Sequence, residues 1–213
     1  MKIKVCGLKY PGNIESVAAL NPDYMGFIFY KNSPRFTGDL NSETLTTIPA
    51  PIHKTAVFVD ETAENIRVLI DNYNFDAIQL HGSETAGFCD SFRDRVKVIK
   101  AFGVTADFDF EQLKDYANKV DFFLFDAKTA IYGGSGNTFD WSVLNKYNFD
   151  VPFFLSGGIG PANIEEVKNI NHPQLYGVDL NSKFEDLPGI KNIAQLKKAF
   201  KTVKKAYNHE LRG

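Results

Sequence analysis

Eight short apolar runs recur along the chain, and each is followed by a segment with helical spacing. Most of the runs are apolar almost without interruption, which is typical of parallel strands buried on both faces. A strand followed by a helix, repeated in this way, predicts a parallel α/β fold. The expected strands span residues 3–6, 24–29, 55–59, 77–80, 96–101, 122–126, 152–156 and 175–180.

The number of repeats favours a closed barrel over an open sheet. Eight strand–helix units are what a (β/α)8 barrel requires, and 213 residues lie close to its lower limit of about 200. An open nucleotide-binding sheet would instead place a Gly-x-Gly-x-x-Gly turn after its first strand, where this chain has Cys6-Gly7-Leu8-Lys9. We therefore expect residues 1–213 to form one compact (β/α)8 TIM barrel domain.

Several residues mark where helices are expected to begin. Asp60 or Thr62 is predicted to cap a helix whose inner face includes Ile66. Ser83 is expected to cap the next helix, and Pro161 to occupy the first turn of a later one.

Charge and cysteine usage narrow the possible partners and the compartment. A net charge of −2 gives no global field for nucleic acid or a membrane surface, and no apolar run approaches the roughly 20 residues of a membrane span. The two cysteines, Cys6 and Cys89, have no metal-type spacing, and the chain opens without an apolar signal segment. We expect a cytoplasmic protein that binds no metal. A lysine-rich group on the last helix is interpreted as a solvated face; its members are Lys197, Lys198, Lys201, Lys204 and Lys205.

The ends of the expected strands carry the chemistry. Active sites of such barrels lie at the carboxyl ends of the strands. Asp126, at the end of a buried apolar run, is poorly placed for stability and well placed for reaction. The other groups at strand ends are Cys6, residues 30–35, Asp60, His81, residues 156–158 and Asp179.

Two of these residues are candidates for acid–base chemistry. Cys6 on residue type alone is a small buried hydrophobe, and it acts as a base only where its surroundings lower its pKa. Asp126 is either an acid or a structural hydrogen-bond acceptor.

The remaining polar residues have more than one interpretation. Arg35 would grip a substrate carboxylate in a bidentate pair, or it is an ordinary surface arginine. Asp179 either orders the barrel mouth or contacts ligand, and a lone His81 is more often structural than a metal ligand. Asp60 and Asp140 are interpreted as helix caps.

Two glycine-rich loops follow the sixth and seventh strands. Residues 157–160 precede a helix, where glycines let backbone N–H groups approach an anion, so we predict a phosphate site there. Residues 133–136 follow Asp126 and are interpreted as a loop that closes over substrate.

Taken together in order, these motifs resemble the phosphoribosylanthranilate isomerase family. The likeness runs from residue 3 to about residue 192 and spans every expected strand end. The motifs include Lys4-Val5-Cys6-Gly7, Ser33-Pro34-Arg35, Gln79-Leu80-His81-Gly82, Gly133-Gly134-Ser135-Gly136 with Phe139-Asp140-Trp141, Leu155-Ser156-Gly157-Gly158 and Gly177-Val178-Asp179.

The resemblance implies a cofactor-free (β/α)8 enzyme of tryptophan biosynthesis that performs an Amadori rearrangement on a small phosphoribosyl substrate. By position, Cys6 matches the general base, Asp126 the general acid and Arg35 the carboxylate-binding residue. The resemblance also implies substrate contacts from His81, Gly134 and Asp179, and phosphate contacts from Gly157, Gly158, Asn181 and Ser182. The family commonly has Ser-Ser-Gly where this chain has Asn181-Ser182-Lys183, which leaves the contribution of this loop to the phosphate site open.

Two other functions remain open at this point. One is a different phosphosugar enzyme, such as an epimerase or an aminoaldose isomerase of histidine synthesis; the latter is expected to have aspartate in place of Cys6. The other is a barrel that only binds ligand or a partner subunit. We expect a monomer or a homodimer.

Overall fold

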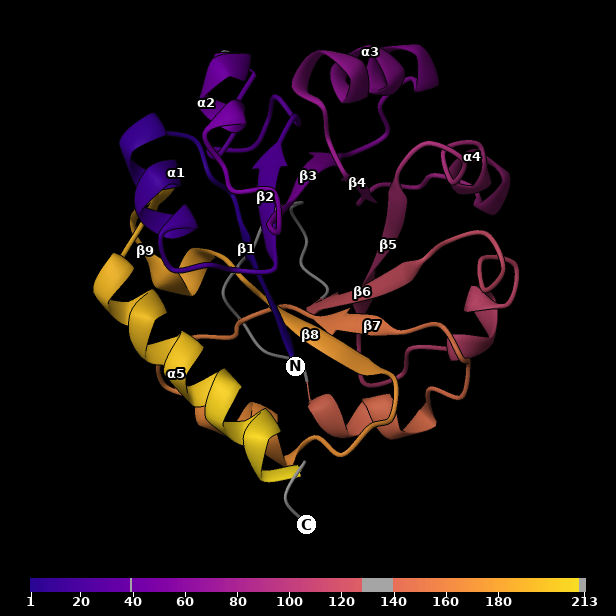
Figure 1. The fold of residues 1–213 in the computed structure, drawn as a ribbon. Helices are drawn as coiled ribbons and strands as arrows, with labels where there is room; N and C mark the ends of the chain where they lie inside the picture. Colours follow the sequence, from indigo (N-terminus) through magenta and orange to yellow (C-terminus); the bar gives the residue numbers. More distant parts are fainter. Residues whose placement is uncertain (39, 128–139, 211–213) are drawn as a thin grey trace.

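The computed structural model describes residues 1–38, 40–127 and 140–210, with side chains through residue 205. Eight parallel strands form a closed barrel in chain order, and the last strand pairs with the first. Figure 1 shows the strands in the centre and the helices outside them. The predicted (β/α)8 barrel is confirmed. Its strands are β1 Lys2–Cys6, β2 Tyr24–Ile28, β3 His53–Phe58, β4 Ala77–Leu80, β5 Lys97–Val104, β6 Phe122–Ala127, β7 Phe153–Leu155 and β8 Leu175–Leu180.

The outer layer is a mixture of α-helices and 3-10 helices. The α-helices are α1 Pro11–Ala18, α2 Ser42–Thr46, α3 Ala63–Tyr73, α4 Ala86–Asp90 and α5 Ile193–Glu210. The 3-10 helices are η1 Phe110–Leu113, η2 Trp141–Lys146, η3 Ile164–Asn169 and η4 Ser182–Phe184. A two-stranded antiparallel hairpin, β9 Glu185–Leu187 and β10 Ile190–Lys191, follows β8.

Two predicted helix starts are wrong. The structure begins η3 at Ile164 rather than at Pro161, because the Asn163 side chain accepts from the Gly160 backbone N–H and closes a turn first. Thr85, not Ser83, caps α4; the Ser83 N–H instead donates to the Asp60 carboxylate, at 2.5 Å. The prediction for α3 is confirmed for Thr62, whose Oγ1 accepts from the backbone N–H of Asn65 at 3.2 Å.

The Thr62 cap gives a stability prediction. Thr62→Ala removes an acceptor for an otherwise unpaired N–H at the start of α3, and we expect it to lower the free energy of unfolding by about 1 kcal/mol. Urea denaturation followed by circular dichroism measures the change. Thr46→Ala is the matched control, because Thr46 is an exposed threonine inside α2 that caps no helix. Equal effects of the two substitutions would contradict the cap.

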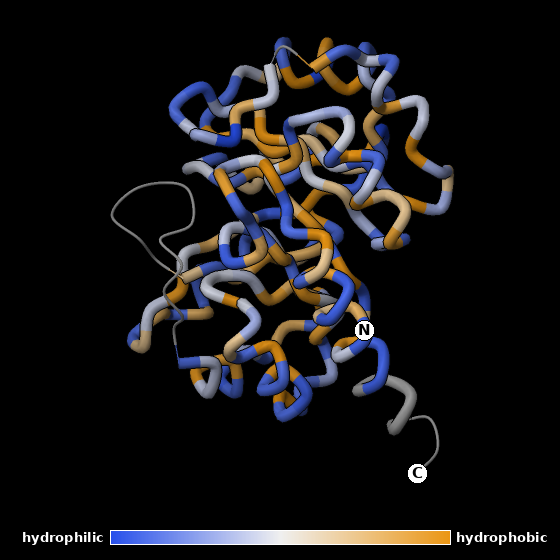
Figure 2. Tube along the Cα trace, turned by 90° about the vertical axis from the view of Figure 1, so that its left-hand side faces the viewer, coloured by the Kyte–Doolittle hydropathy of each residue, from blue (hydrophilic) through white to orange (hydrophobic). Residues whose placement is uncertain are grey.

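Aromatic side chains close the amino-terminal end of the barrel. Tyr24, Phe122, Phe154 and Tyr176 each occupy the first or second position of their strand and pack against one another, with ring centroids 4.6–6.4 Å apart. The hydroxyls of Tyr24 and Tyr176 lie 3.3 Å apart. Figure 2 shows apolar stretches running through the interior of the molecule and polar stretches on many of the outer turns. Because this end is filled, a ligand has to enter from the opposite end.

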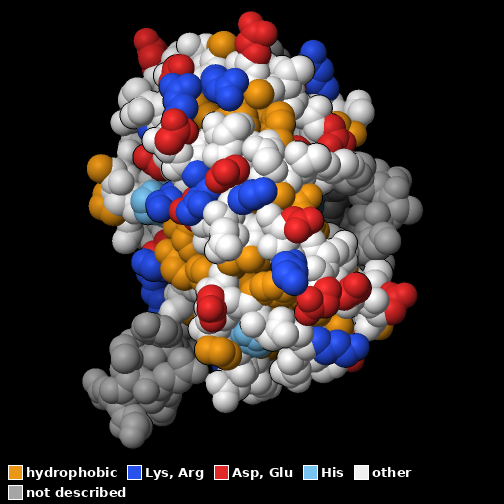
Figure 3. Space-filling view, turned by 90° about the vertical axis from the view of Figure 1, so that its right-hand side faces the viewer, with side chains coloured by type: hydrophobic (Ala, Val, Ile, Leu, Met, Phe, Trp, Pro, Cys, Tyr) orange, Lys and Arg blue, Asp and Glu red, His pale blue; other side chains and the backbone are white. Residues whose placement is uncertain are grey.

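The surface is charged and mixed. On the face in Figure 3, acidic and basic side chains are interspersed. Within the described ranges, no helix has the length and apolar character needed to span a membrane.

Candidate active site

One pocket opens at the carboxyl ends of the barrel strands. It contains about 710 Å³ of empty space, its open mouth included. The walls combine apolar side chains of β2 and β3 with polar groups from the loop after β2 and from the carboxyl ends of β1, β4, β6, β7 and β8. The predicted site residues that line it are Cys6, His81, Asp126, Gly157, Gly158, Asp179, Asn181 and Ser182.

Cys6 faces a buried ion pair. Lys4 precedes it by two positions on β1, so both side chains point into the barrel. Lys4 Nζ lies 3.0 Å from Asp179 Oδ1 on β8, with both side chains almost fully buried, and the Cys6 side chain also interacts with the ammonium electrostatically. Burial would lower the pKa of Lys4, but Asp179 and Cys6 raise it overall. Lys4 is therefore a fixed cation beside the thiol, and it was not among the predicted site residues.

The pKa of Cys6 shifts in the direction opposite to the one expected for a base. Burial raises it, and Asp179 adds to the rise, while Lys4 and Lys191 oppose it without reversing it. The surroundings of Cys6 in the free protein do not lower its pKa, because the thiol is only 3% exposed and loses more hydration than the cations return. Cys6 is consequently a protonated thiol at neutral pH in this state.

Asp126 has the environment expected of an acid. Burial and the nearby Asp179 carboxylate raise its pKa to about 6, against the opposing effects of the Ala127 N–H and of Lys4. The Ala127 N–H donates to Asp126 Oδ1 at 2.9 Å. The other oxygen, Oδ2, lies 3.6 Å from His81 Nε2.

His81 is neutral and is held from its other side. Burial, together with Lys100 and Lys4, lowers its pKa to about 3. Its Nδ1 lies 2.9 Å from Nε2 of Gln79, which also lines the pocket. The sequence points to Gln79 only through the motif Gln79-Leu80-His81-Gly82. In the part of the chain that the structure describes, no group of three or more His, Cys, Asp or Glu side chains is arranged to hold a metal ion.

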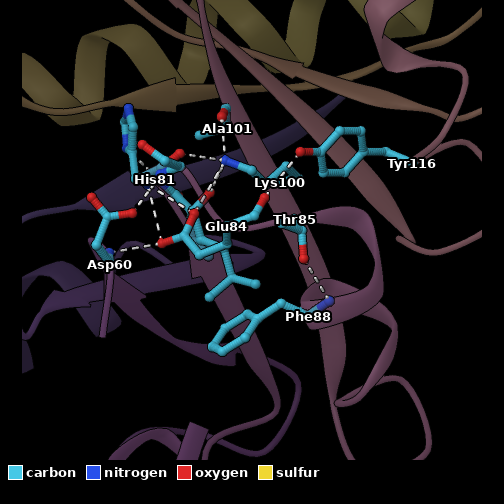
Figure 4. A network of polar contacts seen from close by, with 12 residues as sticks. Asp60, His81, Glu84, Thr85, Phe88, Lys100, Ala101 and Tyr116 are labelled. Carbon is cyan, nitrogen blue, oxygen red and sulfur yellow. Dashed lines mark hydrogen bonds and ion pairs between the residues drawn. The ribbon is translucent and has the colours of Figure 1, made fainter. Parts of the chain in front are cut away.

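A second buried ion pair anchors the loop that carries His81 (Figure 4). Lys100 Nζ lies 3.2 Å from Glu84 Oε2, and it also donates to the carbonyl of Gly82 at 2.8 Å. Glu84 in turn accepts from the backbone N–H groups of Gly82 and Asp60. Lys100, between Ile99 and Ala101 in the apolar run of β5, is the sequence signal for this network. The network fixes the backbone on both sides of Gly82 and so the place of His81.

Arg35 lies beside the site and does not line the pocket. Its Nε and Nη2 bind Glu185 of β9 in a bidentate pair, with distances of 2.7–3.0 Å. Lys191 Nζ shares the same carboxylate at 2.6 Å and reaches Asn181 Oδ1 at 2.8 Å. Burial would raise the pKa of Glu185, but Arg35 and Lys191 lower it overall. Two buried basic side chains thus share one carboxylate next to the pocket, and burial lowers the pKa of Lys191 against the opposing effect of Glu185.

The loop after β7 has the backbone that its glycines suggest. Gly157 and Gly158 have φ values of +81° and +69°, a region that side chains disfavour. A Cβ on Gly157 would also collide with the backbone nitrogen of Ala127, so glycine is required for this loop to pass so close to β6. Lys183 is exposed, and its stem lies over Gly160, which brings the loops after β7 and β8 together. Gly134 lies outside the described residues.

The fold and the position of this pocket define the chain as an enzyme of the (β/α)8 barrel class. The family model for N-(5'-phosphoribosyl)anthranilate isomerase matches residues 3–202. A curated isomerase of that name from Parabacteroides distasonis is 44% identical, over 92% of this chain and 90% of its own length. The chain therefore belongs to the N-(5'-phosphoribosyl)anthranilate isomerase family.

Solved structures agree with that assignment. Phosphoribosyl anthranilate isomerase from Thermotoga maritima superposes with a TM-score of 0.82 and 32% identity, over 96% of this chain and 98% of that one. A phosphoribosyl anthranilate isomerase in complex with reduced 1-(o-carboxyphenylamino)-1-deoxyribulose 5-phosphate has a TM-score of 0.79 and 27% identity, over 96% and 98%. A 3-hexulose-6-phosphate synthase, at 15% identity and a TM-score of 0.63, shares the fold.

Proposed function

We propose that this chain converts N-(5'-phosphoribosyl)anthranilate to 1-(2-carboxyphenylamino)-1-deoxyribulose 5-phosphate, a step of tryptophan biosynthesis. Family membership supports the reaction, and the structure of a relative with a reduced form of that product supports the ligand class. The observation that carries the proposal is that one pocket contains both Cys6 and Asp126, on strands that lie far apart in the sequence. We expect the protein to act in the cytoplasm as a monomer or homodimer; one T. maritima isomerase with this fold is described as dimeric.

The two residues divide the chemistry. Asp126, protonated, donates to the furanose ring oxygen, and the ring opens to an iminium ion. Cys6, as thiolate, then removes the C2' proton, and the resulting enolamine tautomerises to the ketone. A positioned acid or base contributes roughly 10²–10⁴ in rate each.

The pKa directions determine which protonation state reacts. Asp126 has a pKa of about 6, and that of Cys6 lies above its ordinary range. At neutral pH the main form is therefore thiol plus carboxylate, whereas the reaction needs thiolate plus carboxylic acid. Both forms hold one proton, so their ratio does not change with pH between the two pKa values. Lys4, next to the thiol, favours the reactive form.

The remaining binding roles follow the positive charge and the glycine loop. Glu185 occupies the Nε edge of Arg35, and Nη1 makes no hydrogen bond within the described residues, so that end is available to the anthranilate carboxylate. His81 and Asp179 contact the ribosyl part. Gly157 and Gly158 bind the phosphate, with Asn181 and Ser182 beside them.

Arg35→Lys tests the carboxylate contact. Lysine keeps a positive charge beside Glu185 but cannot bind two carboxylates in fixed geometry. We expect KM to rise roughly 10- to 100-fold, the cost of losing a charged hydrogen bond, with kcat changed little. Inhibition by inorganic phosphate should stay constant, since the phosphate loop is untouched. An unchanged KM would exclude Arg35 from carboxylate binding.

The reaction itself is tested by fluorescence. Purified protein added to phosphoribosylanthranilate should abolish the substrate's fluorescence at a rate proportional to enzyme, with a chelator present throughout. Product identity is checked by mass spectrometry, since an isomerisation leaves the mass unchanged. After chemical reduction, the product should co-elute with the reduced standard. Binding of the phosphosugar without turnover would replace the proposal with that of a binding protein.

A further inference from the structure

Gln79 is buried in the pocket wall and contacts His81. It is 2% exposed, it precedes His81 by two positions, and both side chains line the same pocket as Asp126. The amide Nε2 donates to His81 Nδ1 at 2.9 Å, and His81 Nε2 lies 3.6 Å from Asp126 Oδ2. The three side chains therefore form a chain that ends on the proposed acid.

The orientation of the amide decides which imidazole nitrogen carries the proton. With the amide N–H on Nδ1, the ring has its proton on Nε2, facing Asp126. In the opposite orientation, the amide oxygen would accept from Nδ1–H, and the bare Nε2 would face the Asp126 carboxylate. Because Asp126 has a pKa of about 6, it is mostly ionised at pH 7, and two acceptors would then face each other.

The carbonyl end of Gln79 supports the same orientation. Among the described residues, no group donates to Gln79 Oε1. In the opposite orientation, the two amide N–H donors would occupy the position of Oε1 and would lack an acceptor. The repulsion at Asp126 would be added to this loss. A single unpaired acceptor toward the pocket is the smaller loss.

We infer that Gln79 is a positioning residue: it holds His81 in the Nε2–H tautomer, and this N–H stabilises the Asp126 carboxylate as Asp126 gives up its proton. The distance of 3.6 Å is longer than a hydrogen bond, as catalytic contacts often are before substrate binds. The Ala127 N–H already stabilises Oδ1, so His81 supplies the second donor on the conjugate base. The catalytic part of this inference rests on the proposed role of Asp126; the tautomer does not.

The other charged groups near Gln79, His81 and Asp126 are held in place by their own partners. Asp179 and Lys4 face Asp126 from β8 and β1, and Lys100 from β5 and Lys4 face His81. The Lys100 charge is balanced by Glu84, and the Lys4 charge by Asp179. A substitution of Gln79 leaves all four in place, so its effect on Asp126 reports the imidazole.

The tautomer is measured directly by ¹⁵N NMR of the full chain labelled at histidine. We expect His81 to show a protonated Nε2 and a bare Nδ1 at pH 7, and to remain neutral down to pH 5. A protonated Nδ1 in the wild type would overturn the inference. This measurement needs neither a variant nor turnover, so it stands apart from the test of the reaction.

The effect on the acid is measured by ¹³C NMR titration of labelled aspartate. Gln79→Met keeps the volume but leaves the tautomer free, and loss of an N–H aimed at a carboxylate raises the carboxyl pKa. We expect the Asp126 pKa to rise by about half a unit or more. Gln112→Met, at an exposed glutamine of η1, is the matched control and should change nothing.

A double substitution separates positioning from a direct effect. With His81→Phe already present, Gln79→Met should add no further shift to the Asp126 pKa, because Gln79 acts only through the ring. An unchanged Asp126 pKa in Gln79→Met, or shifts that add in the double variant, would overturn the inference.

Discussion

Cys6→Ser should reduce kcat by about 10²–10⁴ while leaving the protein folded, because a serine hydroxyl is too weak an acid to form the oxyanion that would replace the thiolate base. The substitution exchanges one buried atom beside Lys4 and leaves the Lys4–Asp179 pair intact. Single-turnover kinetics, with enzyme in excess over substrate, measure the chemical steps without product release.

Cys89→Ser is the matched control for this prediction. Cys89 is the other free cysteine; it is fully buried on the inner face of α4 and does not line the pocket. The Cys89→Ser variant should retain near-normal turnover, with at most a lower melting temperature. Near-normal turnover in Cys6→Ser would remove Cys6 from the role of base.

Asp126→Asn should lower kcat/KM by a similar factor, about 10²–10⁴, because an amide N–H is too weakly acidic to transfer a proton to the ring oxygen. Asparagine nearly preserves the shape and still accepts from the Ala127 N–H, so the fold should persist.

The pH profile of this variant gives a sharper test than its rate. In the wild type, Cys6 and Asp126 are both protonated at low pH, so kcat/KM should rise with pH up to about 6, where the pair loses one proton. It should then stay level until Cys6 titrates above its ordinary range. In Asp126→Asn, only Cys6 titrates, so the residual activity should keep rising through the pH range in which the wild type is level. A flat profile in the variant would contradict the assignment of the acid.

The raised pKa of Asp126 also makes the stability of the folded protein depend on pH. The folded protein holds this proton more tightly than the unfolded chain does, so the stabilising contribution is complete below the unfolded pKa and is lost as pH rises to about 6. Asp126→Asn should therefore raise the free energy of unfolding slightly at pH 7, which urea denaturation measures.

The barrel was predictable because its local signals are strong. Strands buried on both faces appear as apolar runs, and the predicted run 175–180 coincides with β8. The strand ends then bring Cys6, His81 and Asp126 together with no further information, since parallel strands end at one face.

The partners of these residues were not predictable, because they come from distant places in the chain. Lys4 and Asp179 are 175 positions apart, and Arg35 and Glu185 are 150 apart. Nothing local to Cys6 shows that its hydration loss outweighs a neighbouring ammonium. The 3-10 geometry of η1 and η3 likewise depends on turns that close before each helix starts, and apolar spacing does not report them.

The Lys4–Asp179 contact also lies across the seam where the first and last strands meet. A nascent chain can complete seven strands with Lys4 still lacking its counter-ion, and an ammonium buried alone costs several kcal/mol. The same step that pairs it must close a loop of almost the whole chain, which is slow. Charge balance around the thiol is thus acquired together with barrel closure, and a fragment that ends before β8 has neither.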